Sequence, residues 1–431
     1  MYFLNSTRGR TRFPGTLMLC AWGLVAPALA QPIAYDEALR LAEEHAPALK
    51  AHEQQLEAAR QDAQRAGRLP DPRMTLAVSN WPVTGRDAFA FNADEMTMKQ
   101  VGVMQHFPAR AKRRAQQAVA QRAIEQAEAV TAADRLAVRK LTARAWIALQ
   151  AAENEVTLLQ SLRESPQIAV GNAKARLSAS TGSATDALAA QAAALNLELQ
   201  IDMAQVELDA ARAGLARWLD RMPSDIQTAG QMPDLDRLPV NEGTLLASVD
   251  ALGPLLPWRS REALASASVS EADAGRHPDW SLGLTYGQRG RSPAGGHLSD
   301  MVMLEFSVDL PLFTANRQDR DVAARRADQR AAVADLEEAQ RAQAEALRRT
   351  LAEWQGLKRQ IARKEHEILP LAHDRSQAAL AAYKAGGELQ PWIEARRDEV
   401  QLHVEHARHL RDLGRAWAEL AFLMPATGET P

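Results

Sequence analysis

The chain has 431 residues, of which 51 are Lys or Arg and 54 are Asp or Glu, so its formal net charge is -3. This balance argues against nucleic acid as a partner, because phosphate binding requires a concentrated positive field. Aromatic residues make up only 5% of the chain, whereas Ala, Leu, Arg, Glu and Gln dominate long stretches, which favours long helices packed through small side chains. The single cysteine excludes a disulfide framework and any cysteine-based zinc or iron–sulfur site.

Residues 1–30 are predicted to be a secretory signal peptide, because a basic segment precedes an apolar segment at 16–27 and a small-residue cleavage site. The residues concerned are Arg8, Arg10 and Arg12, and then Ala28-Leu29-Ala30. A short membrane anchor is the alternative, but the apolar run is too short to span a bilayer. Leu19 stands where a lipoprotein signal requires a small residue, so lipidation at Cys20 is not expected and the mature chain would begin at Gln31.

The mature chain contains an internal repeat. Gly67-Arg68-Leu69-Pro70-Asp71 is echoed 208 residues later by Gly275-Arg276-His277-Pro278-Asp279. An alternating segment, a loop and a second alternating segment follow each copy, and the second segments begin with Met96-Thr97-Met98 and Met301-Val302-Met303, at an offset of 205. We therefore expect two repeats, at 31–222 and 243–424, joined by a Pro- and Gly-containing linker at 223–242 and followed by a C-terminal tail at 425–431.

Long helical patterns surround the alternating segments. They cover 35–66, 110–164 and 184–220 in the first repeat and 243–274, 315–380 and 389–423 in the second. Eight of twelve heptad positions between Val333 and Leu371 are apolar, which is typical of a coiled coil. A helix of ~55 residues would be on the order of 80 Å long, far longer than a helix of a globular domain.

The alternating segments have the length and pattern of strands that cross a bilayer with one face to lipid and one to a polar lumen. A half-buried sheet in a soluble domain is the alternative. Four strands cannot close a barrel, and open edges are not tolerated in lipid, so several copies would have to pool their strands. Three copies would supply twelve.

The segment 301–310 predicts which strand face lines the lumen. Its even positions, Val302 to Leu310, are all apolar, whereas the odd positions carry Met301, Met303, Glu305, Ser307 and Asp309. An acidic side chain is costly against lipid, so the odd positions should face the lumen. The offset of 205 adds Met96 and Met98 to that face, and Lys99 then points outward, where it must reach an interface.

Two further segments carry a resemblance to a known family. Residues 176–191 resemble the hairpin motif of the TolC-like outer-membrane efflux proteins, and Tyr383 to Gly386 resemble its second copy. The resemblance implies a mainly α fold with a small β portion, in which two helix-strand-strand-helix repeats form a trimeric 12-stranded outer-membrane β-barrel continued by a periplasmic α-helical coiled-coil tunnel. It also implies a homotrimer that works with a periplasmic adaptor (membrane fusion protein) and an inner-membrane resistance-nodulation-division (RND) pump.

A finer resemblance points to the heavy-metal efflux branch, the CusC and CzcC group. It rests on Leu69-Pro70-Asp71-Pro72, Asn80-Trp81-Pro82-Val83, Met96-Thr97-Met98 and Gln105-His106-Phe107-Pro108. The expected function is export of heavy-metal cations, with drug efflux or type I protein secretion as the alternative. A soluble periplasmic coiled-coil adaptor and an exported metal-binding protein are alternatives of a different class. No lipoyl-like or barrel module of an adaptor is evident between two helices.

No catalytic motif or phosphate loop is present, so neither an enzyme nor a cofactor is expected. His403 and His406, one helical turn apart, could chelate a metal ion, but they also fit a packing seam. Met96, Met98, Met301 and Met303 carry thioethers that suit Cu(I) or Ag(I), but methionine also fills irregular gaps. We favour the structural interpretation for both sets.

The resemblance also implies a periplasmic gate and adaptor-docking surface at the two hairpin tips. The candidate residues there are Arg176, Gly182, Asp186, Tyr383, Lys384 and Gly386. Charge pairs among them would hold the closed state, and the alternative role of Asp186 is that of a helix cap.

Overall fold

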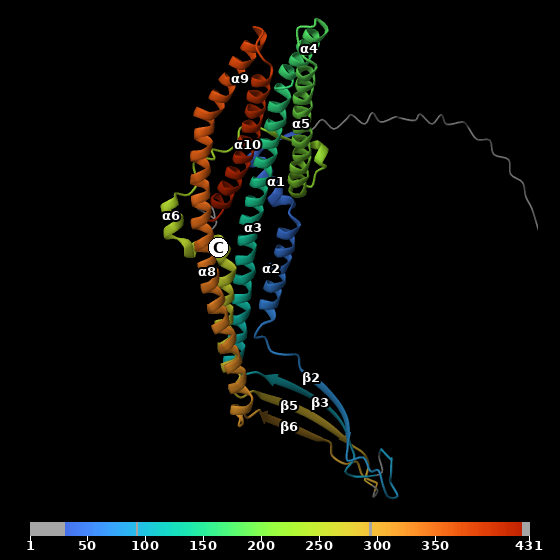
Figure 1. Ribbon diagram of the computed structural model, residues 1–431. Coiled ribbons are helices and arrows are strands. Elements are labelled where there is room, and N and C mark those ends of the chain that lie inside the picture. Colours follow the sequence, from blue (N-terminus) through green and yellow to red (C-terminus); the bar gives the residue numbers. More distant parts are fainter. Residues whose placement is uncertain (1–30, 92–93, 293–294, 425–431) are drawn as a thin grey trace, which may run out of the picture.

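Long helices give the protein an elongated shape, with a small sheet at one end and two helical hairpin tips at the other (Figure 1). The computed structural model describes residues 31–91, 94–292 and 295–424. The expected signal peptide at 1–30 and the expected tail at 425–431 lie outside the described residues. Within the described ranges, no helix is long and apolar enough to cross a membrane.

The first repeat departs from the predicted helices at two points. Its elements are β1 (Gln31–Ala34), α1 (Tyr35–His45), α2 (Pro47–Arg65), β2 (Arg73–Ser79), β3 (Met98–Phe107), α3 (Arg110–Ser161), α4 (Glu164–Ser178) and α5 (Ala184–Leu219). The helix expected at 35–66 is divided at Ala46, because the ring of Pro47 disfavours a helical conformation in the residue before it. Helix α4 was not predicted, and Pro166 lies in its first turn, where a missing N–H is tolerated.

The second repeat is interrupted where proline and glycine occur. Its elements are α6 (Glu242–Ala247), α7 (Leu256–Ala274), β5 (Trp280–Arg289), β6 (Met301–Val308), α8 (Gln318–Arg363), α9 (Leu369–Lys384) and α10 (Gln390–Ala421). The helix expected at 243–274 is continuous only from Leu256, because a 3₁₀ turn with Gly253 and Pro254 precedes it. A π-helical turn at Lys364–Ile368 divides the helix expected at 315–380, just before Pro370, which has no N–H for the helical ladder.

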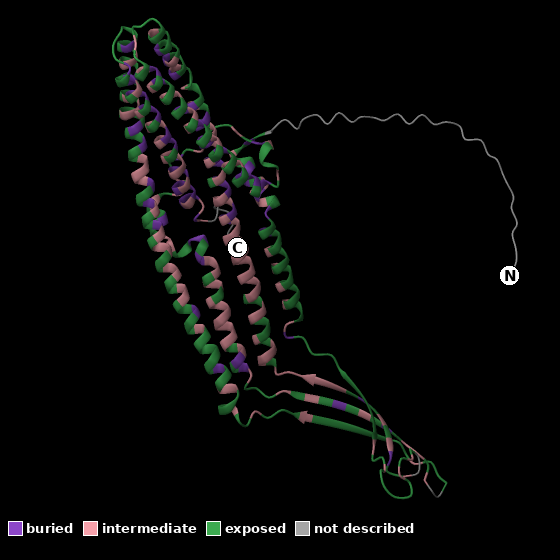
Figure 2. Ribbon diagram, turned by 45° about the vertical axis from the view of Figure 1, so that its right-hand side comes forward, coloured by how far each residue is buried: buried purple, intermediate pink, exposed green. Residues whose placement is uncertain are grey.

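The long strands of both repeats form one antiparallel sheet in the order β2-β3-β5-β6 (Figure 1). β2 pairs with β3 in the first repeat, β5 pairs with β6 in the second, and β3 pairs with β5 between the repeats. The free edges of the sheet are therefore β2 and β6. Most strand residues are exposed or half-buried, whereas buried residues gather in the helical part (Figure 2).

The helices next to the sheet lie side by side in the same order as the strands to which they connect. α2 packs against α3, α3 against α7, and α7 against α8. Farther from the sheet, α5 and α10 pack against α3, and α8 and α9 pack against α10. The heptad positions Leu347, Trp354 and Ile361 are buried in this packing, whereas Val333 and Leu371 remain exposed.

A segment of chain that we call the belt, made of β1 and residues 226–237, crosses the middle of the helices. β4 (Ile226–Ala229), which lies in the expected linker, pairs in parallel with β1. Three indole N–H groups donate hydrogen bonds to backbone carbonyls of this belt. They run from Trp146 to Ile33 at 2.9 Å, from Trp354 to Leu235 at 2.9 Å and from Trp417 to Arg237 at 2.7 Å. Because these tryptophans belong to α3, α8 and α10, the belt is tied to both repeats.

Candidate functional site

One face of the sheet is apolar along all its strands. Residues that pair across an antiparallel ladder point to the same face, so the strand registers define this face directly. Its exposed apolar members in the middle of the strands are Met74, Leu76, Val78, Val101, Val103, Leu282, Leu284, Tyr286, Val302, Leu304, Phe306 and Val308. We call this set the apolar face. A contiguous exposed surface of this kind marks contact with lipid or with another protein.

Aromatic side chains bound the apolar face at both ends, and a charged side chain lies at its loop end. Next to the helices, Trp280 stacks on Phe107 with 4.0 Å between the ring centroids. In the loop region at the far end, Trp81 stacks on Phe91 with 4.5 Å between the centroids. Lys99 lies on the apolar face at the loop end, as the register predicted. Membrane barrels carry such aromatic girdles on both sides of an apolar band.

The opposite face, called the polar face below, carries small and polar side chains. Its members include Thr75, Ala77, Met98, Gln100, Gly102, Met104, Gly283, Thr285, Met301, Met303, Glu305 and Ser307. Several of them line a hollow of about 170 Å³. The absence of a side chain at Gly102 is required by close packing, because a Cβ there would lie 2.6 Å from Oγ1 of Thr285.

Of the four methionines that the sequence pattern placed on the lumen face, three lie on the polar face. Met98, Met301 and Met303 share this face with Glu305. The expected place of Met96 in the strand is wrong, because it precedes β3 and lies in a turn. The registers show why: Gly102 and Glu305 occupy equivalent places in the two repeats, so the second strands correspond at an offset of 203 rather than 205.

The two predicted histidines lie on α10, and His406 faces the π-helical turn. Nε2 of His406 is 3.4 Å from Oε1 of Glu365. Burial lowers the pKa of both His403 and His406, so the neutral imidazoles are favoured. No group of three or more His, Cys, Asp or Glu side chains in the described part of the chain is placed to hold a metal ion. His406 therefore contacts the π-helical turn through Glu365.

At the hairpin tips the structure brings together two of the predicted gate residues. The guanidinium Cζ of Arg176 lies 5.5 Å from the ring centroid of Tyr383, and its Nη1 is 3.5 Å from the carbonyl oxygen of Gly387. The ring of Tyr383 is buried with Trp392 against alanines of α4 and α5. Arg176 thus connects the first hairpin to the second.

The remaining predicted gate residues lie in or next to the turns of the two hairpins. Oγ of Ser183 caps α5 by accepting from the Asp186 N–H at 3.0 Å, so Ser183 rather than Asp186 is the capping residue. A Cβ at Gly182 would lie 2.9 Å from Cβ of Arg176, so the first turn requires glycine there. Gly386 has a φ of +99°, which favours glycine in the second turn. Within the described ranges, the side chains of Asp186 and Lys384 make no ion pair.

A buried charge network near the tips was not predicted from the sequence. Arg396 donates to Oε2 of Glu399 at 2.8 Å and to the carbonyl oxygen of Leu162 at 3.1 Å, so α10 is joined to the end of α3. Nδ1 of His373 on α9 lies 2.9 Å from Oε1 of Glu399. Burial alone would raise the pKa of Glu399, but hydrogen bonds with His373, Ser376 and Arg396 hold it below its usual value.

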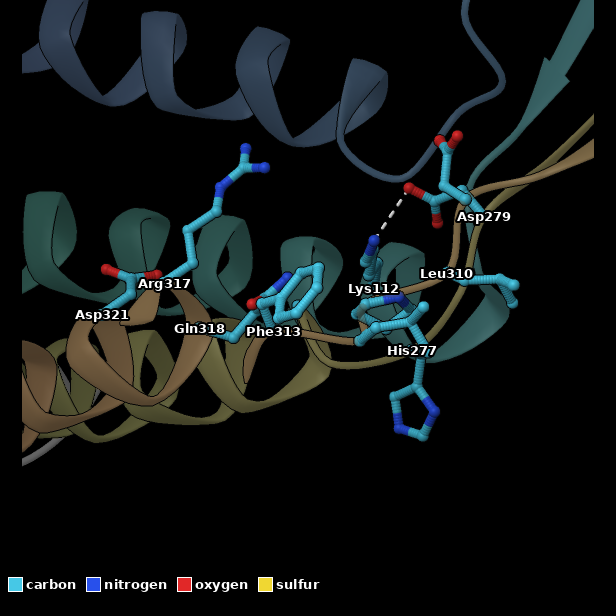
Figure 3. A pocket seen from close by; sticks show the side chains of 12 residues that line it. Lys112, His277, Asp279, Leu310, Phe313, Arg317, Gln318 and Asp321 are labelled. Atoms are coloured by element: carbon cyan, nitrogen blue, oxygen red, sulfur yellow. Dashed lines mark hydrogen bonds and ion pairs between the residues drawn. The ribbon is translucent and has the colours of Figure 1, made fainter. Parts of the chain in front are cut away.

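Asp279 connects the sheet to the helices (Figure 3). Its carboxylate accepts from the Ala109 N–H at 2.7 Å and from Nζ of Lys112 at 2.8 Å, at the start of α3. Burial alone would raise the pKa of Asp279, but these hydrogen bonds hold it below its usual value. The carboxylate therefore joins the residue before β5 to the start of α3.

Comparisons with known proteins agree with this architecture. Residues 255–425 match the family model described as "Outer membrane efflux protein". No curated protein matches the chain significantly in sequence. Among solved structures, VceC of Vibrio cholerae is 19% identical, with a TM-score of 0.70 over 90% of this chain and 94% of that chain. The fold is that of the TolC-like outer-membrane channels.

Other structures with the TolC-like fold are similar to about the same degree. The CmeC outer membrane channel of Campylobacter jejuni is 14% identical, with a TM-score of 0.75 over 97% of this chain and 93% of that chain. CusC is 15% identical, with a TM-score of 0.72 over 91% of this chain and 92% of that chain. These likenesses confirm the predicted fold class and do not single out the CusC and CzcC group.

Proposed function

We propose that three copies of this chain close their sheets into a twelve-stranded barrel in the outer membrane, and that the helices continue the barrel as a periplasmic tunnel. The observation that carries the proposal is the sheet itself. It has an apolar face between two aromatic girdles, a polar face and two free edges. Free edges are not tolerated in lipid, so the edges must be paired by further copies.

In this role the protein is the outer-membrane component of a tripartite efflux system. It receives cargo from an inner-membrane RND pump through a periplasmic adaptor, and it needs neither a cofactor nor covalent chemistry. The hairpin tips, with Arg176 and Tyr383 in contact, form the periplasmic gate, and the exposed Lys384 beside them contributes to adaptor docking.

The proposed cargo is a heavy-metal cation. Met301 and Met303 are exposed rather than packed into a gap, and they lie on the polar face with Met98 and Glu305. The barrel would therefore offer soft thioether ligands near a carboxylate. Isolated ligands of this kind bind weakly, which suits a conduit that must also release its ions.

Deletion in the native host tests both parts of the proposal. The deletion strain should become sensitive to a transition metal such as copper, silver, zinc or cobalt, and the wild-type gene should restore resistance. A variant with Met98, Met301 and Met303 replaced by leucine tests the thioethers separately. Sensitivity confined to hydrophobic drugs would assign the channel to drug efflux, and absence of the protein from the outer-membrane fraction would overturn the channel assignment itself.

A further inference from the structure

A cavity at the loop end of the sheet has a basic lining to which the proposed channel function assigns no role. It has a volume of about 570 Å³ and lies where the loop between β2 and β3 meets the loop between β5 and β6, at the end of the molecule remote from the helices (Figure 1). Its lining includes Lys99, Arg289, Arg291 and His297, and no Asp or Glu among the described residues lines it. A hollow lined by charges of one sign attracts ligands of the opposite sign.

The cations of this cavity have no carboxylate partner. In the described part of the chain, Lys99 and Arg291 make no ion pair, and both residues are exposed. Arg289 donates from Nε and Nη2 to the carbonyl oxygen of Glu95, at 3.1 Å and 2.8 Å. Because this acceptor carries no formal charge, the charge of Arg289 is not neutralised either.

Two carboxylates of the same loops are engaged elsewhere. Asp300 accepts from the hydroxyl of Tyr286 and from the backbone N–H of Arg289, the latter at 3.0 Å. The carboxylate of Glu95 accepts from the hydroxyl of Ser292. Neither Asp300 nor Glu95 lines the cavity, so an anion bound in it would meet the cations and not these carboxylates.

The strand register places the cavity beside the apolar face and away from the free edges of the sheet. Lys99 and Gln288, which both line the cavity, pair across β3 and β5 and lie on the apolar face, next to the pair of Val101 with Tyr286. β3 and β5 are the inner strands in the order β2-β3-β5-β6. A single copy therefore contains the whole site, and the site adjoins the surface that faces lipid in the proposed barrel.

The wall formed by the first loop is fixed by contacts within that loop. Phe91 lines the cavity and stacks on Trp81, with 4.5 Å between the ring centroids. The hydroxyl of Thr97, a buried lining residue, donates to the carbonyl oxygen of Asn80 at 2.9 Å. The side-chain amide of Asn80 in turn donates to the carbonyl oxygen of Met96 at 3.2 Å. A wall held in this way loses little conformational freedom when a ligand binds.

We propose that this cavity binds the phosphate group of a phosphorylated glycolipid in the outer leaflet, with the acyl chains of the lipid along the apolar face. Lys99 and Arg291 bind the phosphate, and Arg289 adds its charge from the wall. Phosphate suits such a site because guanidinium groups bind its oxygens in a bidentate manner, and basic pockets beside lipid-facing surfaces bind lipid head groups. A free anion would use the cations alone, whereas a lipid also uses the adjoining apolar face. The inference rests on the proposed function, which places the loop end in the outer leaflet.

Titration of the purified, delipidated full-length protein in detergent with lipid A tests the site, with native mass spectrometry as the readout. Binding to the wild type should be saturable. Lys99→Gln and Arg291→Gln should each weaken it by about 5- to 30-fold, since each removes one charged contact with the phosphate. The matched control is Arg86→Gln, because Arg86 is also exposed in the loop between β2 and β3 but does not line the cavity. The control should bind lipid A as the wild type does.

The chemistry of the ligand is tested with two further probes. Dephosphorylated lipid A should bind the wild type more weakly than lipid A, and the double variant Lys99→Gln/Arg291→Gln should no longer distinguish the two lipids. Lys99→Arg keeps the charge and should keep the preference for the phosphorylated form. Inorganic phosphate at the same concentration as lipid A should not displace it, because phosphate lacks acyl chains. Displacement under these conditions would assign the cavity to a free anion and overturn the lipid site.

The outcomes separate this inference from the proposed function. If the double variant still prefers phosphorylated lipid A, or if Arg86→Gln loses as much affinity as Lys99→Gln, the cavity is not the binding site. If the wild type is found in the outer-membrane fraction but binds both lipids equally, the inference fails and the proposed function stands. If the protein is absent from the outer-membrane fraction, the proposed function fails and the lipid site fails with it.

Discussion

The guanidinium of Arg176 lies over the ring of Tyr383, with its Cζ 5.5 Å from the ring centroid. The two residues belong to different repeats, so this contact joins the two helical hairpins at the end remote from the sheet (Figure 1). The hydroxyl of Tyr383 is buried without a hydrogen-bond partner in the described structure. The ring, rather than the hydroxyl, therefore carries the contact.

Loss of the Arg176 guanidinium should loosen the tips. A cation–π contact contributes ~0.5–2 kcal/mol, so Arg176→Ala should raise the open probability of single channels in planar bilayers by about 2- to 30-fold. Tyr383→Phe keeps the ring and removes an unpaired hydroxyl, so it should stay close to wild type, whereas Tyr383→Leu should resemble Arg176→Ala. Equal open probabilities for all of these proteins would show that the contact does not hold the gate.

The Arg396–Glu399 pair should make stability depend on acid pH. The folded-state pKa of Glu399 is lowered, so the pair stabilises the protein above the unfolded-state pKa of about 4.3 and loses this contribution as the pH falls through the lower folded-state pKa. Glu399→Gln leaves Arg396 buried without a counter-charge and should cost about 3–5 kcal/mol at neutral pH. Thermal unfolding between pH 3 and 7 should show a flatter profile for this variant, and a parallel profile would contradict the prediction.

His403 should make the stability of the protein depend on pH in a different range, between pH 7 and 5. Burial lowers its folded-state pKa, so the unfolded chain binds a proton first as the pH falls through about 6.5. Stability should therefore decrease on acidification from pH 7 to 5. His403→Gln should remove part of that decrease and leave the decrease below pH 4.5 unchanged. The same unfolding experiment measures it, and an unchanged slope between pH 7 and 5 would exclude His403 as a source.

Two helical glycines should respond to alanine with opposite signs. A Cβ at Gly414 in α10 would lie 2.3 Å from Cγ2 of Ile147, so Gly414→Ala should destabilise the protein by about 1–3 kcal/mol through overpacking. Gly356 in α8 has no atom within 4 Å of the added Cβ, so Gly356→Ala should stabilise by up to ~1 kcal/mol through helix propensity. Denaturant unfolding of both variants checks this, and destabilisation of similar size in both would exclude the packing explanation.

Thiol labelling should distinguish the two faces of the sheet in the assembled protein. Cysteines at positions 98, 301 and 303 should react with water-soluble reagents, whereas cysteines at 302, 304 and 306 should be protected by lipid. A cysteine at position 99 should react from outside the cell, because Lys99 lies at the loop end. The opposite pattern would reverse the assignment of lipid and lumen faces.

Much of the fold was predictable from the sequence, because periodicity and repetition are local signals. The alternation in residues 301–310 placed Glu305 and Met303 on one face, and the register bears this out. The choice of Met-x-Met as the repeat anchor misplaced Met96 by two residues. Because two is the period of a strand, the face of Met98 was still correct. His106-Phe107-Pro108 and Asp309-Leu310-Pro311 carry the true offset of 203.

The contacts near the tips could not be predicted, because they depend on how helices distant in sequence lie together. Arg396 reaches the carbonyl of Leu162, 234 residues earlier, and no local pattern marks either residue. The unpredicted break at Ala46, by contrast, had a local signal in Pro47. Helix α4 lies between the helices predicted at 110–164 and 184–220. Its sequence shows too little apolar periodicity to mark where a separate helix begins and ends.

The N–H groups of the three indoles that hold the belt donate to carbonyl oxygens of the backbone. Any residue at positions 33, 235 and 237 presents the same carbonyl acceptor, so these three hydrogen bonds do not depend on the side chains at those positions. They do depend on the number of residues along the belt, because each carbonyl oxygen must lie opposite the N–H of a fixed indole. Substitutions at exposed belt positions such as Arg237 should therefore be tolerated, whereas insertion or deletion of one residue between β4 and Leu235 should displace two of the three hydrogen bonds at once.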